Sequence, residues 1–97
     1  MLRLTLARLL AQNGQWDAAA EHLQSALAQN PAYTAAWKEL GQVRQAMGQN
    51  DIALAAWQKG VEVARSNGDK QAEKEMAVFL RRLLRAQEER GQSQEPE

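Results

Sequence analysis

Apolar residues recur at spacings of three and four over most of the chain, which is the pattern of amphipathic α-helices. Trp37, Leu40 and Val43, for example, fall within one arc when successive residues are placed about 100° apart around an axis. β-Branched and aromatic residues, which favour strands, are few. The pattern therefore predicts an all-α chain without strands, with helices over about residues 2–12, 17–29, 33–47, 51–65 and 69–90.

Turn and capping residues separate these predicted helices. Gly14 and Gly48 follow the first and third helices, where glycine adopts the left-handed conformation at low steric cost. Asp17 and Asp51 come shortly afterwards, and we expect their carboxylates to cap the second and fourth helices. Residues 91–97 are too polar to bury, so we expect a disordered tail there.

One short segment occurs twice in the chain. Its first copy is Gly14-Gln15-Trp16-Asp17-Ala18-Ala19, and its second copy, 34 residues later, is Gly48-Gln49-Asn50-Asp51-Ile52-Ala53. The same spacing pairs residues further out: Leu6 with Leu40, Ala7 with Gly41, Leu23 with Trp57, Ala26 with Gly60 and Leu27 with Val61. A period of about 34 residues is typical of helical-hairpin repeats, in which each hairpin buries its apolar face against a neighbour.

On these residues the chain resembles the tetratricopeptide repeat (TPR) family. The second unit carries most of the family's landmarks: Trp37, Leu40, Gly41, Gly48, Ala53, Trp57 and Gly60. The first unit keeps Leu6, Ala7, Gly14, Ala19, Leu23, Ala26 and Pro31. The resemblance implies a single domain with repeat one over residues 1–33, repeat two over 34–67 and a capping helix over 69–90. The alternative for the last helix is the first half of an incomplete third repeat, in which Met76 corresponds to Leu40 after a two-residue insertion. The run from Phe79 to Leu83 is similar to the closing helix of small stand-alone bacterial members.

Composition and charge argue against several classes of partner. The 97 residues include 12 Lys and Arg and 12 Asp and Glu, and a neutral chain is not expected to bind nucleic acid or a membrane surface. A nucleic-acid contact through Arg81, Arg82 and Arg85 is disfavoured further because Glu88 and Glu89 follow. The chain has no cysteine, hence no disulfide, which fits a reducing compartment such as the cytoplasm.

No residue pattern indicates catalysis, a metal site or a bound cofactor. His22 is the only histidine, and without cysteine or a second ligand at suitable spacing we expect it on a helix surface. The serines have no activating base nearby in the sequence, and neither glycine turn carries the lysine of a phosphate-binding loop. We therefore expect a protein that is not an enzyme. Trp16, Trp37 and Trp57 are expected to pack the core, with ligand stacking as the lesser alternative for Trp16.

In TPR proteins the first helix of each repeat lines the concave side, so the faces opposite the buried arcs of the first, third and fifth helices form a candidate groove. These faces carry Leu4, Arg8, Gln12, Lys38, Gln42, Gln45, Lys74, Val78, Arg81 and Arg85. Five of these ten residues are basic, with Glu39 and Glu75 expected nearer the margin. The set predicts a groove for an acidic or C-terminal peptide segment of a partner protein. The alternative is that long polar side chains merely solvate these helix faces.

The first helix suggests a different role, as part of a homo-oligomeric structural module. It carries more leucines than one hairpin partner can cover: Leu2, Leu4, Leu6, Leu9 and Leu10. Terminal repeats need a polar outer face or a covering neighbour. We therefore expect a self-association edge at Leu2, Leu4 and Leu9, covered by a second copy in a two-fold dimer or by a helix upstream of Met1.

Overall fold

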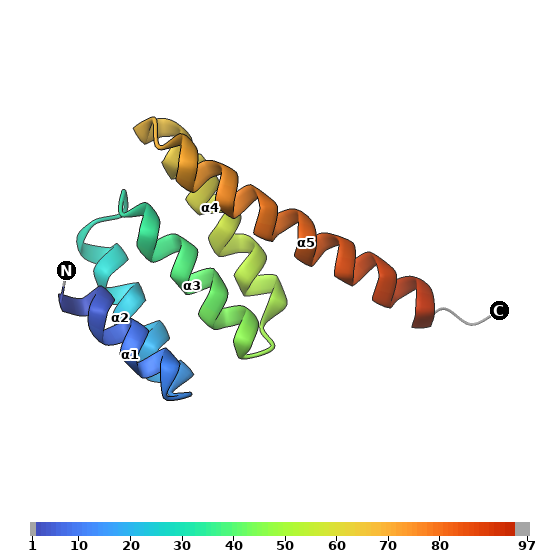
Figure 1. Ribbon diagram of the computed structural model, residues 1–97, viewed down its shortest axis with the longest axis horizontal. Coiled ribbons are helices and arrows are strands. Elements are labelled where there is room, and N and C mark those ends of the chain that lie inside the picture. The colour runs from blue at the N-terminus through green and yellow to red at the C-terminus, as the bar shows by residue number, and fades with distance from the viewer. Residues whose placement is uncertain (1, 95–97) are drawn as a thin grey trace.

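The computed structural model describes the backbone of residues 2–94 and the side chains of residues 3–90. This part of the chain forms five α-helices and no strand: α1 (Leu2–Gln12), α2 (Trp16–Gln29), α3 (Thr34–Ala46), α4 (Asn50–Asn67) and α5 (Lys70–Gln94). Each helix packs against the next one along the chain, and α3 also contacts α5 (Figure 1). The predicted all-α fold of helical hairpins is therefore confirmed.

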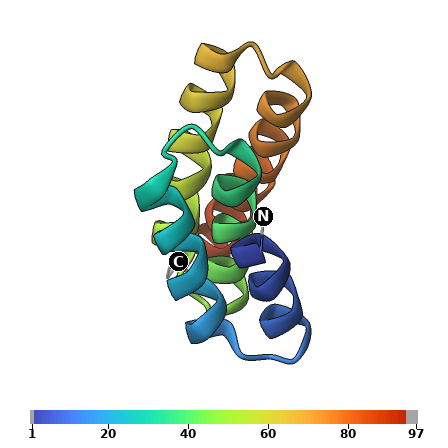
Figure 2. The same cartoon turned by 90° about the vertical axis from the view of Figure 1, so that its left-hand side faces the viewer.

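The hairpins form an elongated stack with α1 and α2 at one end and α5 at the other. Figure 2 looks onto the α1–α2 end. In Figure 1 the C-terminal part of α5 extends beyond α4. α5 is also longer than predicted, because it continues to Gln94, so residues 91–94 are helical instead of disordered although only the two glutamines among them are good helix formers. Residues 95–97 of the predicted tail lie outside the described residues.

Apolar side chains form two joined clusters. The first lies mainly between α1, α2 and α3 and contains Leu4, Ala7, Ala19, Ala20, Leu23, Leu27, Ala36, Leu40, Val43 and Ala56. The second joins α4 and α5 and contains Ala53, Trp57, Ala64, Met76 and Leu83. Trp37 is only partly buried but packs against both clusters. Trp57 is fully buried, as expected, and Trp16 is half-buried.

The inward face of α1 differs from the predicted one. Leu4 is 6% exposed and belongs to the first cluster, so its assignments to the open groove and to the self-association edge are wrong. Leu6 and Leu9 are instead 41% and 52% exposed. The reason is that Leu6 corresponds to Leu40, which is buried against the preceding hairpin, whereas no described helix precedes α1. The side chain of Leu2 lies outside the described residues.

Two predicted helix caps are wrong. α2 and α4 each begin one residue before the expected aspartate, and neither start has a side-chain capping hydrogen bond. Asp17 and Asp51 therefore lie inside the first turns, where a negative charge still complements the helix dipole. Asp69 does cap its helix: its Oδ1 accepts a hydrogen bond from the backbone N–H of Ala72 at 3.1 Å, which secures the start of α5.

Candidate functional site

Two of the five cations in the predicted groove are paired across neighbouring helices. Arg8 of α1 contacts Glu39 of α3, with 2.6 Å between Nη2 and Oε2. Lys38 of α3 contacts Glu75 of α5, with 3.0 Å between Nζ and Oε1. The hydrogen bond to Glu39 and its charge raise the pKa of Arg8, and the hydrogen bond from Lys38 lowers the pKa of Glu75. Glu39 and Glu75 thus neutralise two of the five cations of the predicted groove.

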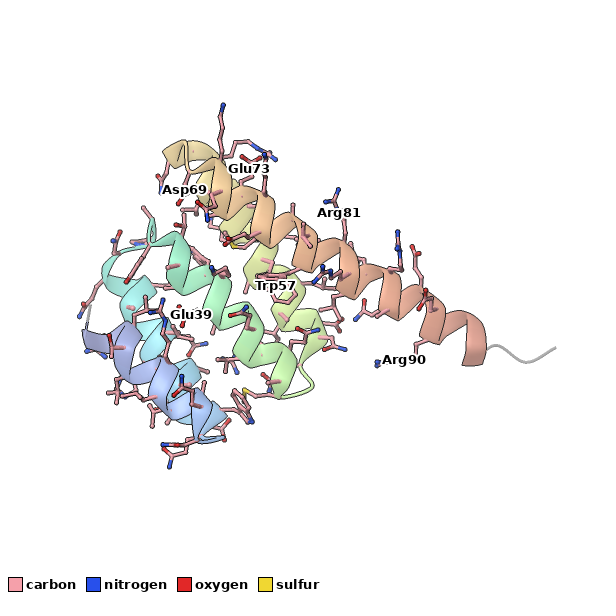
Figure 3. The ribbon with its side chains drawn as sticks, in the orientation of Figure 1. Glu39, Trp57, Asp69, Glu73, Arg81 and Arg90 are labelled. Carbon is pink, nitrogen blue, oxygen red and sulfur yellow. The ribbon has the colours of Figure 1, made fainter. Side chains whose placement is uncertain are left out.

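The other three cations of the predicted groove all lie on α5. Lys74, Arg81 and Arg85 are exposed, and they form no ion pair with another described residue. Figure 3 shows Arg81 pointing away from α3 and α4. Two open hollows lie along the surface of this helix, lined by its own residues, and Val78 and Arg81 line both of them. We call Lys74, Val78, Arg81 and Arg85 the outer basic face of α5.

A separate cavity of about 410 Å³ lies between α1 and α3. Three predicted groove residues, Arg8, Gln12 and Gln42, are exposed at its mouth. The rest of the lining is mostly apolar and comes from Ala7, Ala11, Trp16, Leu23, Val43 and Ala46, with Glu39 beside Arg8. The sequence pattern did not predict this apolar lining, because the predicted groove contained only residues on helix faces opposite the buried arcs.

The predicted groove residues therefore occupy different places. Three line the α1–α3 cavity: Arg8, Gln12 and Gln42. Four form the outer basic face of α5. Lys38 and Gln45 line neither place, since Lys38 lies in its ion pair and Gln45 is exposed near the end of α3. Contact of any of them with a partner stays a prediction.

The acidic and histidine side chains of residues 3–90 do not gather into a metal-binding cluster. No group of three or more His, Asp or Glu side chains in that range is placed to hold a metal ion. His22 is half-buried on α2, and its Nδ1 has no hydrogen-bond partner among the described residues. None of the helices formed by the described residues combines the length and the hydropathy needed to cross a bilayer.

The sequence of this chain is similar to those of known repeat proteins. A family model described as tetratricopeptide repeat matches residues 1–43. The TPR repeat-containing protein PA0015 of Pseudomonas aeruginosa is 49% identical over 86 residues, which cover 89% of this chain and 82% of that protein. The chain belongs to the tetratricopeptide repeat family. Its resemblance to small bacterial TPR proteins is thereby confirmed.

Solved structures of TPR proteins agree with the five-helix stack. The solution structure of protein BPP2914 from Bordetella parapertussis is 47% identical with a TM-score of 0.81, and the match covers 88% of this chain and 74% of that one. A crystal structure of a TPR domain protein from Salinibacter ruber has a TM-score of 0.78 at 21% identity, covering 84% and 91% of the two chains. The second likeness shows the fold alone.

TPR proteins generally act as non-catalytic scaffolds that bind other proteins. With its family and fold shown, this TPR chain is a protein–protein interaction module. Three features of the described surface are candidates for contact with a partner: the outer basic face of α5, the α1–α3 cavity and the exposed leucines of α1.

Proposed function

We propose that this TPR protein binds an acidic segment of a partner protein along the outer basic face of α5. One observation carries the proposal: three exposed cations without ion-pair partners among the described residues line two adjoining hollows that share Val78 and Arg81. Hydrogen bonds from Arg and Lys to carboxylates are stronger than neutral ones, and unpaired cations are free to form them. The apolar surface of Val78 offers contact to the stems of the acidic side chains.

The cations of α1 and α3 are less suited to this role. Arg8 and Lys38 already donate to Glu39 and Glu75. An acidic ligand at either position would have to displace an existing carboxylate, so its net gain would be small. The proposed contact therefore uses only three of the five cations of the groove that the sequence predicts.

Titration of a fluorescent hexaglutamate peptide tests this proposal. We expect weak binding that falls as salt is raised, because the contacts are exposed charges. Replacing both Arg81 and Arg85 by Glu should abolish it, while a control with the same charge change, Arg3→Glu with Lys59→Glu on α1 and α4, should retain it. Equal loss in both variants would show only a net-charge effect. Tighter binding of single-stranded DNA of matched charge would also contradict a protein ligand.

Self-association through α1 is a second candidate function, favoured by the exposure of Leu6 and Leu9. Their equivalents 34 residues later, Leu40 and Val43, are both buried in the first cluster. The other large exposed apolar residues in the described part, Ile52 and Leu84, each stand singly on their helices, so α1 of a second copy is the matching surface in a two-fold dimer.

Sedimentation tests this second candidate. We expect a dimer at micromolar concentration that Leu9→Glu converts to a monomer. Ile52→Glu is the matched control, because Ile52 is 47% exposed on α4 and should leave the dimer intact. A wild-type protein that is monomeric at every concentration would remove this candidate without touching the α5 proposal.

A further inference from the structure

The cavity between α1 and α3 has a filled counterpart one repeat further along the chain. Leu23, which lines the cavity, corresponds to Trp57, which lies 34 residues later and is 1% exposed. Ala7, which lines it too, corresponds to Gly41. The Trp57 indole occupies the space that any side chain on Gly41 would enter. The Trp57 indole thus fills a space beside Gly41 whose equivalent in repeat one, beside Ala7 and Leu23, is open.

The opposite wall differs in the same way. Met76 and Leu40 are both buried, and aligning them at a spacing of 36 residues pairs Phe79 with Val43 of the cavity. The rings of Trp57 and Phe79 pack with their centroids 5.4 Å apart and their planes tilted by 44°. Leu23 of α2 and Val43 of α3 therefore stand where α4 and α5 carry the rings of Trp57 and Phe79, which accounts for the unfilled volume.

The mouth of the cavity is polar without net charge. Arg8 and Glu39 neutralise one another from opposite helices. Gln12 and Gln42 are exposed, one on each of the same two helices. Each amide side chain can both donate and accept a hydrogen bond, as the groups of a peptide backbone require. Such a mouth suits an uncharged side chain entering from an extended peptide.

We propose that this cavity binds a bulky aromatic side chain from an extended segment of a partner protein. The chain's own Trp57 and Phe79 identify the class of occupant, because they fill the equivalent space between α3 and α5. A volume of about 410 Å³ is within the range of small-ligand pockets. Half-buried Trp16 adds an aromatic surface to the lining. The site is separate from the outer basic face of α5 and does not depend on it.

Nuclear magnetic resonance titration with N-acetyl-phenylalaninamide tests the site directly. We expect shifts at the Trp16 indole N–H and the Ala46 methyl, with a dissociation constant on the order of 1 mM, as befits a fragment of this size. N-acetyl-alaninamide has the same backbone groups and should bind at least about 10-fold more weakly if the ring supplies the binding. Equal binding of the two probes would overturn the proposal.

Two cavity-filling variants locate the binding. Ala46 is exposed on α3 and lines the cavity, so Ala46→Leu should weaken binding of the phenylalanine probe about 10-fold or more. Ala55 is exposed on α4 outside the cavity, so Ala55→Leu should leave that binding unchanged. The double variant Ala7→Gly with Leu23→Trp reproduces the Gly41–Trp57 pair of repeat two in repeat one. Its new indole should occupy the cavity and so abolish binding of the phenylalanine probe. Circular dichroism establishes that each variant is folded.

Two outcomes would contradict the cavity proposal, and one of them distinguishes it from the proposal for α5. Unchanged probe binding in folded Ala46→Leu would place the probe elsewhere and overturn the site. Replacing Arg81 and Arg85 by Glu should leave the phenylalanine probe unaffected while it removes hexaglutamate binding. Loss of the phenylalanine probe in that variant would contradict a separate site.

Discussion

The indole of Trp57 lies so close to Gly41 that a side chain at position 41 would overlap with it. The contact is held by a hydrogen bond of 3.1 Å that Trp57 Nε1 donates to the carbonyl oxygen of Lys38. Gly41→Ala should therefore lower the free energy of unfolding by about 1–3 kcal/mol through overpacking. This is the reverse of the gain of up to about 1 kcal/mol that alanine normally brings to a helix interior.

A double-mutant cycle measured by denaturant titration checks the cause. Trp57→Leu in the same chain recreates the Ala7–Leu23 pair of repeat one, so Gly41→Ala should cost less in that background. Simple additivity of the two losses would show that the indole contact is not responsible.

Trp57 and Trp37 should differ in their contribution to stability, although the sequence pattern placed both in the core. Trp57 is 1% exposed, so Trp57→Ala should lower the free energy of unfolding by about 3–5 kcal/mol. Trp37 is half-buried, and its Nε1 donates to the exposed carbonyl of Pro31 at 2.8 Å. Trp37→Ala should cost less than about 3 kcal/mol. Equal losses in urea titration would contradict the burial difference.

Asp69 should contribute more to stability than Asp51. Besides capping α5 through Oδ1, Asp69 accepts a hydrogen bond at Oδ2 from the Thr34 hydroxyl at 3.1 Å, which ties the start of α5 to α3. Asp69→Ala should cost about 1–2 kcal/mol of unfolding free energy. Asp51→Ala removes only a charge near a helix start and should cost about 0.3–1 kcal/mol. Thermal unfolding of both variants would show the opposite order if Asp51 were the true cap.

The Lys38–Glu75 pair should make stability depend on acid pH. Lys38 donates to Glu75 and holds the pKa of that carboxyl below its ordinary value of 4.5. A carboxyl whose pKa is lower in the folded state stabilises the protein above its unfolded pKa, and loses this effect as pH falls through the folded pKa. The stability difference between wild type and Glu75→Gln should therefore be constant above about pH 5 and shrink below the ordinary value.

Chemical denaturation across pH 2–7 measures that difference. Glu62→Gln, exposed on α4, is the matched control for loss of one carboxylate. A difference between wild type and Glu75→Gln that stayed flat down to the most acid point would contradict the coupling to Lys38.

Local features of the fold follow from the sequence alone. The first helix lies where the periodicity placed it, and Gly14 and Gly48 adopt positive φ values of 78° and 79°. Helix propensity and turn conformation depend on residues a few positions apart, so they can be read along the chain. The 34-residue spacing identifies the stacking mode as well, because Leu23 and Trp57 recur at the position that each hairpin must bury.

The surfaces that a partner would meet were decided only by the tertiary structure. Periodicity shows that α1 is apolar on several sides, but the packing of α2 and α3 determines that Leu4 is buried and Leu6 exposed. The ion pair of Arg8 joins residues 31 positions apart, beyond the reach of any local pattern. The direction of Arg81 likewise depends on how α5 lies on α4. Contacts between helices depend on relative rotation and side-chain volume, which a linear pattern does not encode.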